Sequence, residues 1–298
     1  MRTAVITLAA GRHRHLSLQQ AGLAASSYPP DQYVVVAMDD PHLRTVLADR
    51  DPAATVIDCP VNEGNLPLAR ARNLGAARAL QDGAELLVFL DVDCVPGERL
   101  LERCVQVASD PAHRHSLLCG TVAYLPPPGP SGYRLSDLHA LAAPHAGRPS
   151  PAPGEIIEGR DHTLFWSLSF ALTADTWHTI GGFCDEYEGY GGEDTDFGQR
   201  ARAAGTRLIW VGGAPAFHQY HPTSTPPVQH LRDILRNAAV FQRRWGWWPM
   251  NGWLDQFADL GLIHWDHATG RWELAPAAVG VPVTEKPDQP PIPTTGPV

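Results

Sequence analysis

The sequence predicts an α/β protein with a largely parallel central sheet. Two observations lead to this prediction: short apolar runs of strand type alternate with segments of helical period, and they follow one another in a βαβα order. Parallel strands in that order are joined by crossover helices, which cover both faces of the sheet. The 298 residues, 44% of them apolar, suffice for one large core or two modest ones.

The individual elements follow from the apolar patterns in chain order. Strands are expected at residues 3–9, 33–38, 55–58, 86–90, 117–122 and 207–211, and structure resumes at 167–172 and 174–180 after a long insertion. Helices are expected at residues 66–80, 194–204 and 231–245, where apolar side chains share one face. The insertion at 125–153 is rich in Pro and Gly and has little periodicity, so disorder and a working lid both remain open for it.

Composition excludes several classes of protein. A net charge of -9 and the lack of a Lys/Arg-rich run argue against a nucleic-acid partner. No apolar run approaches the roughly 20 residues of a membrane helix, and the first strand lacks the features of a signal peptide. The 5 cysteines form no Cys-x-x-Cys pair, which indicates reduced thiols rather than disulfides or zinc ligands. We therefore expect a cytoplasmic protein without a transmembrane segment, and peripheral contact with the inner membrane face remains open.

Two acids follow the apolar run Leu86 to Leu90 directly. Because side chains alternate along a strand, Asp91 and Asp93 point to the same side where the chain leaves the sheet. Carboxylates at that place can share a divalent cation and the diphosphate that it neutralises. An Asp-x-Asp pair alone is weak evidence, because exposed strand ends and helix caps often contain one.

A second acidic segment is more distinctive. Glycines at 189, 191 and 192 precede Glu193 and Asp194, which open the helix expected at 194–204. The glycines permit tight packing of the backbone around a bulky substrate, and the helix macrodipole favours acids at its start. Helix stabilisation alone would explain a single acid. Four acids crowded among aromatic residues and glycines indicate a functional site instead.

With these segments considered together, the chain resembles a GT-A glycosyltransferase of the inverting family-2 type. Its C-terminal half is similar to the β-1,4-galactosyltransferase and chondroitin-polymerase group. The motifs that carry the resemblance are Arg70-x-Arg72-Asn73-x-Gly75, Leu90-Asp91-Val92-Asp93 with Pro96, Gly-Gly-Phe at 181–183, Gly-Tyr-Gly-Gly-Glu-Asp-Thr-Asp at 189–196 with Arg200, and Phe217-His218-Gln219 with His221.

The resemblance implies a GT-A domain over residues 1–222. Its nucleotide-binding half would be residues 1–124, its flexible loop 125–154, and its acceptor and catalytic half 155–222. A helical, Trp-rich extension would follow at 223–274, and the Pro- and Thr-rich residues 275–298 would form a disordered tail.

The resemblance also implies a metal site that serves a nucleotide-diphosphate sugar. Asp93 would ligate the metal, and Asp91 would lie against the ribose or sugar of the donor. His218 would complete the site, with His221 as the alternative. Imidazole beside carboxylate and phosphate oxygens suits Mn²⁺ better than Mg²⁺.

The implied reaction is a single displacement that inverts the anomeric configuration. Asp194 would be the general base that takes the proton of the acceptor hydroxyl. Glu193 would hold the acceptor or orient the base, and Tyr190, Gly191 and Gly192 would line the acceptor site.

The other residues that the resemblance implies for donor binding lie in less specific sequence motifs. Either Asp39 or Asp40, at the end of strand 33–38, would bind the uracil ring of a UDP-sugar, although a helix cap explains them equally well. Arg70 and Arg72 would approach the diphosphate, although exposed helix arginines are a similar alternative. The acid expected after strand 3–9 is missing, and Arg12 or backbone groups would replace it.

Two alternatives belong to other functional classes. A nucleotidyltransferase on a related fold also uses metal-bound acids, but the segment Ala9 to Arg14 is a poor copy of its Gly-rich signature. A non-catalytic module that binds nucleotide sugars or glycans would have lost some of these acids. The donor is expected to be a hexose or N-acetylhexosamine. Lipid-linked, polysaccharide and small-molecule acceptors all remain consistent.

Overall fold

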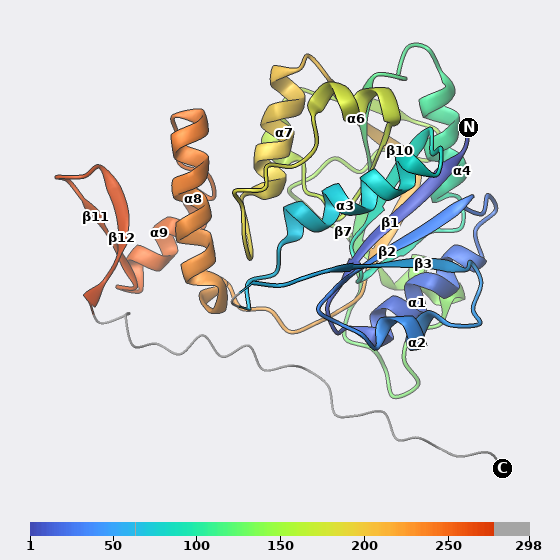
Figure 1. Ribbon diagram of the computed structural model, residues 1–298, viewed down its shortest axis with the longest axis horizontal. Coiled ribbons are helices and arrows are strands. Elements are labelled where there is room, and N and C mark those ends of the chain that lie inside the picture. The colour runs from blue at the N-terminus through green and yellow to red at the C-terminus, as the bar shows by residue number, and fades with distance from the viewer. Residues whose placement is uncertain (63, 277–298) are drawn as a thin grey trace.

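The computed structural model describes residues 1–62 and 64–276, and Figure 1 shows a central sheet with helices on both sides. The strands of the main sheet are β1 (Thr3–Ala9), β2 (Gln32–Met38), β3 (Ala54–Cys59), β4 (Leu86–Leu90), β5 (Cys94–Pro96), β6 (Ser116–Tyr124), β7 (Ala143–Pro144), β8 (Ile156–Gly159), β9 (Ser169–Thr173) and β10 (Arg207–His218). The helices of this body are α1 (His13–Ala24), α2 (Leu43–Leu47), α3 (Leu68–Gln81), α4 (Leu100–Ser109), α5 (Leu138–Leu141), α6 (Ala174–Ile180) and α7 (Glu193–Ala203).

The long strands of the sheet run in one direction with a single exception. The order along the sheet is β3-β2-β1-β4-β9-β6-β10-β5. The pairs β3–β2, β2–β1, β1–β4 and β6–β10 are parallel, and β9 lies antiparallel between β4 and β6. The predicted α/β fold with a mostly parallel sheet is confirmed. The carboxyl ends of β4, β6 and β10 therefore meet at one edge.

Two apolar layers enclose the sheet. One face packs against α1, α2 and α4, through side chains such as Leu16, Leu47 and Leu101. The other face packs against α3, α6 and α7, where Trp177 and Phe197 are largely buried. Strands covered on both faces are continuously apolar, which explains why β1 and β4 begin and end where the sequence pattern predicts.

β10 is longer than the strand predicted at 207–211. Its register against β6 shifts between Val211 and Ala216, and the strand then continues to His218. Gly212 and Gly213 interrupt the apolar run at this bulge, so the sequence pattern ends there although the pairing does not. The extra residues carry the strand to the edge where the acids lie.

The insertion at 125–154 contains short elements in the structure. Residues 135–137 form a 3₁₀ turn, α5 follows, and β7 pairs with the end of β6. These pairings hold part of the insertion against the carboxyl edge of the sheet, and Arg148 at its far end is buried. Whether the insertion acts as a lid remains untested.

The last described residues form a small unit beside the main body, shown in orange and red in Figure 1. It consists of α8 (Leu231–Trp245), α9 (Asn251–Asp259) and the hairpin of β11 (Ile263–Asp266) and β12 (Arg271–Leu274). Leu254, Phe257 and Ile263 are buried at its centre, with Trp248, Trp253 and Trp272 packed around them. We call α8, α9, β11 and β12 the C-terminal unit.

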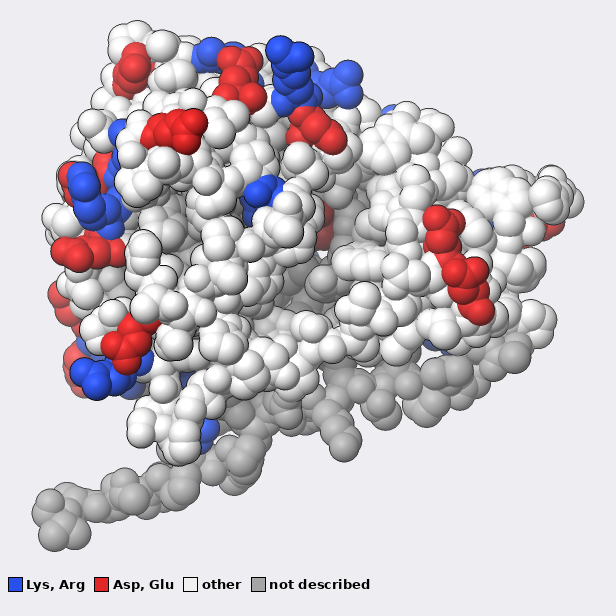
Figure 2. Space-filling view, turned by 180° about the vertical axis from the view of Figure 1, so that it is seen from behind, with Lys and Arg blue, Asp and Glu red and all other residues white. Residues whose placement is uncertain are grey.

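Figure 2 shows the face opposite to that of Figure 1, with a hollow between the main body and the C-terminal unit. Charged side chains lie mostly around the rim of this face. Among the described residues, no helix is long and apolar enough to cross a membrane. The cytoplasmic location expected from the sequence stays a prediction, and the tail expected at 275–298 lies almost entirely outside the described residues.

Candidate active site

The first part of the site forms where β4 ends. After Leu90 the chain turns through Asp91 and Asp93 into β5, which pairs antiparallel with the end of β10 so that Cys94 faces His218. The backbone N–H of Gln219 donates a 2.8 Å hydrogen bond to the carbonyl oxygen of Asp93. This pairing places Asp93 beside the histidines that follow β10.

Three side chains converge there in a pattern that suits a metal ion. Nε2 of His218 lies 3.5 Å from Oδ1 of Asp93, and Nε2 of His221 lies 3.5 Å from Oδ2 of the same carboxylate. One ligand atom from each of the three lies within 4.8 Å of the others. The structure therefore brings both histidine candidates to Asp93, without a preference for His218.

The Asp93 carboxylate is kept ionised. Burial alone would raise its pKa, but a hydrogen bond from His221 and the charges of His218 and Arg12 hold the pKa well below its usual range. Arg12 forms an ion pair with Asp93. Burial lowers the pKa of His218, which favours the neutral imidazole that can ligate a metal. One carboxylate and two imidazoles fit Mn²⁺.

Arg72 connects the two acidic segments. Its Nη2 donates to Oδ1 of Asp91 and its Nη1 to Oε1 of Glu193, both at 3.1 Å. The guanidinium lies 5.2 Å from the ring centroid of Phe183, and only 4% of the side chain is exposed. A buried arginine with two carboxylate partners fixes their separation, because its planar fork sets the geometry of both hydrogen bonds. Burial raises the pKa of Asp91 to about 6 despite this pairing.

Glu193 and Asp194 occupy the first turn of α7. Burial, together with the charge of Asp194, raises the pKa of Glu193 to about 7. Burial also raises the pKa of Asp194, although the Arg72 charge and hydrogen bonds from Thr195 oppose the shift. Oε2 of Glu193 is buried without a hydrogen-bond partner among the described residues. A carboxylate with a raised pKa at a concave site is a candidate acid or base.

The glycine-rich loop before α7 is held by the C-terminal unit. Nδ2 of Asn237, on α8, donates to the carbonyl oxygens of Glu188 at 2.9 Å and Gly191 at 2.8 Å. Oδ2 of Asp233 accepts from the backbone N–H of Tyr190 at 3.2 Å. A β-carbon at residue 189, where φ is +69°, would collide with the Asp233 carboxylate. Only glycine fits there, so α8 determines the path of the loop.

Comparisons with known proteins identify the family match and the fold. Residues 161–222 match the family described as the N-terminal domain of galactosyltransferase. Structural similarity covers more of the chain. The first 349 residues of S. aureus TarS in complex with UDP-GlcNAc superpose with a TM-score of 0.56 at 12% identity, over 87% of this chain and 80% of that one. GalNAc-T7 with UDP, GalNAc and Mn²⁺ gives a TM-score of 0.52 at 15% identity, over 87% and 57%. The chain has the GT-A glycosyltransferase fold.

Further matches support the same GT-A assignment. The mannosyltransferase PcManGT from Pyrobaculum calidifontis, in complex with GDP-Man and Mn²⁺, gives a TM-score of 0.51 at 18% identity over 81% of this chain and 64% of its own. A validoxylamine A glucosyltransferase from Streptomyces hygroscopicus subsp. limoneus is 26% identical over 218 residues, 65% of this chain and 47% of that relative. One from subsp. jinggangensis is 28% identical over 170 residues, 50% and 39%. The matches span less than half of either curated relative. The resemblance to GT-A glycosyltransferases inferred from the motifs is confirmed.

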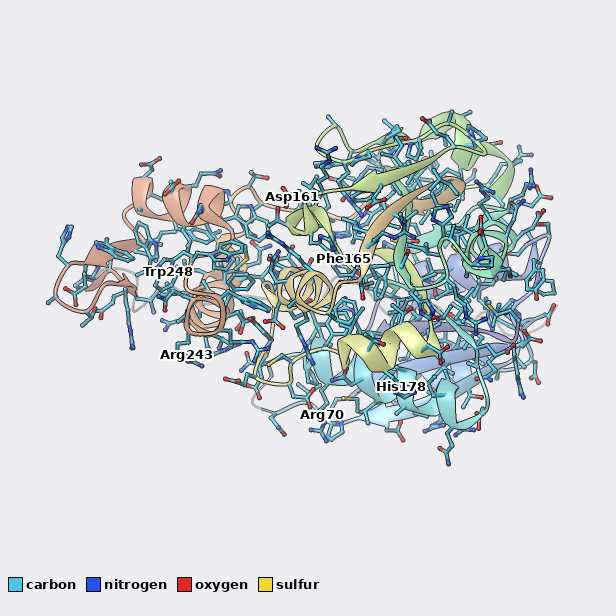
Figure 3. The ribbon with its side chains drawn as sticks, turned by 90° about the horizontal axis from the view of Figure 1, so that it is seen from above. Arg70, Asp161, Phe165, His178, Arg243 and Trp248 are labelled. Carbon is cyan, nitrogen blue, oxygen red and sulfur yellow. The ribbon has the colours of Figure 1, made fainter. Side chains whose placement is uncertain are left out.

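The remaining residues predicted to bind the donor are Asp39, Asp40 and Arg70. Asp40 accepts hydrogen bonds from the backbone N–H of Gly11 at 2.8 Å and from the ring of His13 at 2.7 Å, so it fixes the turn after β1. Asp39 is exposed at the end of β2. Arg70 is exposed on α3 and lies at the outer edge of the molecule in Figure 3. Its side chain makes no hydrogen bond or ion pair within the described ranges, so the structure does not bring Arg70 to the acids.

Tyr190 lies between the acids and the C-terminal unit. Its ring stacks on His230 with 4.4 Å between centroids, and Trp253 lies 6.0 Å away. Burial and the charges of Asp194 and Glu193 raise the pKa of its phenol. Tyr190 is 39% exposed, so part of this residue is open to solvent.

Sequence reasoning missed several residues around this site. Asn237 and Asp233 are polar positions on a helix that the sequence pattern treats as solvent-facing. Asp196, one of the four acids of the block, proves to be fully buried and bound to α8 instead of facing a substrate. Arg148 lies in a segment without periodicity. Arg12, considered from sequence only as a substitute for a missing acid, pairs with Asp93.

Proposed function

We propose that this protein is a metal-dependent, inverting glycosyltransferase. It moves a hexose or N-acetylhexosamine from a nucleotide-diphosphate sugar, with UDP as the first nucleotide to test, to an acceptor hydroxyl. The confirmed GT-A fold supports the nucleotide-sugar donor, since the structural relatives carry UDP, UDP-GlcNAc or GDP-Man. The names of the curated relatives make glucose the first sugar to test.

The observation that carries the proposal is the link between two acidic segments far apart in the sequence. Arg72 bridges Asp91, beside the candidate metal ligands, to Glu193, beside the candidate base. A displacement at an anomeric carbon needs a charged group for the leaving diphosphate and a base for the incoming hydroxyl. The bridge connects the two sets of groups through one buried side chain, which supports a shared site.

The metal would be held by Asp93 together with His218, His221 or both. Their donor set fits Mn²⁺, and two solved relatives carry that ion. A bound divalent ion supplies positive charge that stabilises a departing diphosphate. Arg12, which is paired with Asp93, would add a second positive charge there.

Asp194 would act as the general base. Its raised pKa makes the carboxylate a stronger base, and the hydrogen bonds from Thr195 orient one oxygen. The carboxylate takes the proton of the acceptor hydroxyl as that oxygen attacks the anomeric carbon. Glu193 would receive a hydrogen bond from the acceptor at its unpartnered Oε2. Tyr190 and the backbone of Gly191 and Gly192 would form the acceptor wall.

Donor hydrolysis tests the proposal without knowledge of the acceptor. Wild type is incubated with a panel of UDP- and GDP-sugars in Mn²⁺, Mg²⁺ or EDTA, and the release of nucleoside diphosphate is measured. We expect release from one donor, dependent on metal, lost in Asp93→Ala and reduced in Asp194→Asn. Binding of a nucleotide sugar without turnover would support a non-catalytic module instead. Formation of a nucleotide sugar from a sugar phosphate and a nucleoside triphosphate would support a nucleotidyltransferase.

A further inference from the structure

One buried arginine in the insertion has no polar partner. Arg148 lies between β7 and β8 and is 8% exposed. Its guanidinium carbon lies 5.0 Å from the ring centroid of Trp166 and 4.9 Å from that of Trp210. Two indole faces therefore flank the cation, which is a favourable but non-directional interaction.

The hydrogen-bonding capacity of Arg148 is unused. Nε, Nη1 and Nη2 are all buried, and none has a hydrogen-bond partner in the part of the chain that the structure describes. Arg72 provides a direct contrast, because it is equally buried but donates to two carboxylates. Buried guanidinium donors without acceptors are costly, so each one calls for an explanation, and a bound anion is one that suits a cation.

Arg148 lies beside the proposed site. Burial lowers the pKa of its guanidinium, and the side chains that act on its charge are Cys119, Tyr124, Asp194 and Cys94. Geometry connects Arg148 to the candidate metal ligands through ring contacts. The indole of Trp166, which lies against Arg148, is 4.9 Å from the ring of His145, and His145 is 5.7 Å from Tyr124. Tyr124 in turn stacks on His218 with 4.8 Å between centroids.

We propose that Arg148 binds an oxyanion of the substrate, a phosphate or a carboxylate, at the proposed active site. This inference rests on the proposed glycosyltransferase function. The planar fork of arginine matches both groups with paired N–H···O bonds, and the two indoles hold the fork in one plane. The oxyanion comes either from the diphosphate of the donor or from an acid group on the acceptor.

Entry of the ligand requires a local movement. The three nitrogens are closed off from bulk water, so the ligand reaches them when the residues that cover Arg148 shift. Residues 143–147, which precede it, are exposed on their outer side.

The test compares Arg148→Met and Arg148→Lys with wild type, and uses Arg134→Met as the matched control. Arg134 lies in the same insertion, but its side chain is 78% exposed. Affinities are measured by calorimetry for UDP with Mn²⁺, GDP with Mn²⁺, inorganic phosphate, D-glucuronate and, as a neutral probe, D-glucose. We expect Arg148→Met to weaken oxyanion binding by about tenfold or more, with D-glucose unaffected and Arg148→Lys intermediate.

The probes separate the two sources of the oxyanion. A loss confined to the nucleoside diphosphates assigns Arg148 to the donor, and a loss confined to phosphate or D-glucuronate assigns it to an anionic acceptor. Equal affinities of Arg148→Met and wild type for every oxyanion would overturn the proposal, and a lowered melting temperature alone would identify a packing role. If Arg148→Met does not fold, unchanged affinities in Arg148→Lys have the same meaning. Failure of wild type to bind any nucleoside diphosphate would contradict the proposed function instead, and the phosphate and D-glucuronate arms would still test Arg148.

Discussion

The indole Nε1 of Trp245 donates a 2.7 Å hydrogen bond to Oδ1 of Asp196, which joins α8 of the C-terminal unit to α7 of the GT-A domain. Arg244 donates to the same oxygen at 2.8 Å, and the hydroxyl of Tyr187 at 3.2 Å. Asp196 is fully buried, two residues after the candidate base. One carboxylate therefore fixes α8, α7 and the loop between α6 and α7 relative to each other.

Substitution of Asp196 should destabilise the whole chain. In Asp196→Ala, three donors lose their acceptor, and Arg244 loses its partner in a partly buried ion pair. We expect the free energy of unfolding to fall by about 3 kcal/mol in urea denaturation. Asp255→Ala, at an exposed acid on α9, is the control and should change the unfolding free energy by about 0.5 kcal/mol or less. Equal effects of the two substitutions would show that the shared carboxylate does not hold the helices together.

Removal of the Asn237 amide should affect transfer more than donor binding. Asn237→Ala releases the carbonyls of Glu188 and Gly191, so the acceptor wall and the start of α7 lose a fixed position. We expect kcat/KM for transfer to fall by about 10- to 100-fold, because small displacements of catalytic groups are costly. The dissociation constant of UDP with Mn²⁺ should stay within about twofold, since Asn237 holds the loop and not the metal ligands.

Gln242→Ala on the same helix is the control, because the Gln242 side chain makes no hydrogen bond within the described ranges. Both variants are assayed for transfer kinetics and for nucleotide affinity. A parallel loss of transfer and of nucleotide affinity in Asn237→Ala would indicate general unfolding of the site instead of a displaced acceptor loop.

The fold was largely predictable because burial leaves a simple pattern. β4 is a continuous apolar run covered on both faces, and α8 shows its apolar stripe over its full length. The pattern fails where an element is interrupted by glycines or is very short. β10 continues through two glycines, and β7 is a two-residue pairing at the end of β6. The apolar period of the sequence is broken at the first and has no room to appear in the second.

The site was predictable only in part, for a related reason. Asp91 and Asp93 follow a strong strand and Glu193 and Asp194 open a strong helix, so the sequence places the first pair at an edge of the sheet and the second at a helix start. The choice between His218 and His221 depends on how the chain turns after β10, which no period encodes. Asn237 acts by holding a loop that is 46 residues earlier in the chain. Its importance appears only when α8 is placed against that loop.

Both histidines at Asp93 should contribute to metal binding. Each imidazole approaches a different oxygen of the same carboxylate at 3.5 Å. We expect His218→Ala and His221→Ala each to weaken Mn²⁺ binding by about tenfold or more, measured by electron paramagnetic resonance titration, and Asp93→Asn to weaken it further. EDTA should abolish turnover of wild type. The control is His264→Ala, at an exposed position on β11. An unchanged affinity in either histidine variant would remove that residue from the ligand set.

The pH dependence of transfer should report the pair at the start of α7. Burial raises the pKa of Asp194, and that of Glu193 is raised to about 7. A general base works in its ionised form, so activity must be low below its pKa and rise with pH to a plateau above it. We expect log(kcat/KM) for wild type to rise through an apparent pKa above the ordinary value of 3.8 for Asp, and this value belongs to the coupled pair.

Two substitutions separate the members of that pair. Asp194→Asn should lower kcat by about 10²- to 10⁴-fold and remove the rise with pH, because it deletes the base. Glu193→Gln tests which carboxylate ionises first. The charge of Asp194 raises the pKa of Glu193, so Asp194 ionises while Glu193 is still protonated, and the rising limb should stay in place in Glu193→Gln. A limb that moves to lower pH in Glu193→Gln would show that the charge of Glu193 acts on the base, and one that persists in Asp194→Asn would assign the base to another group.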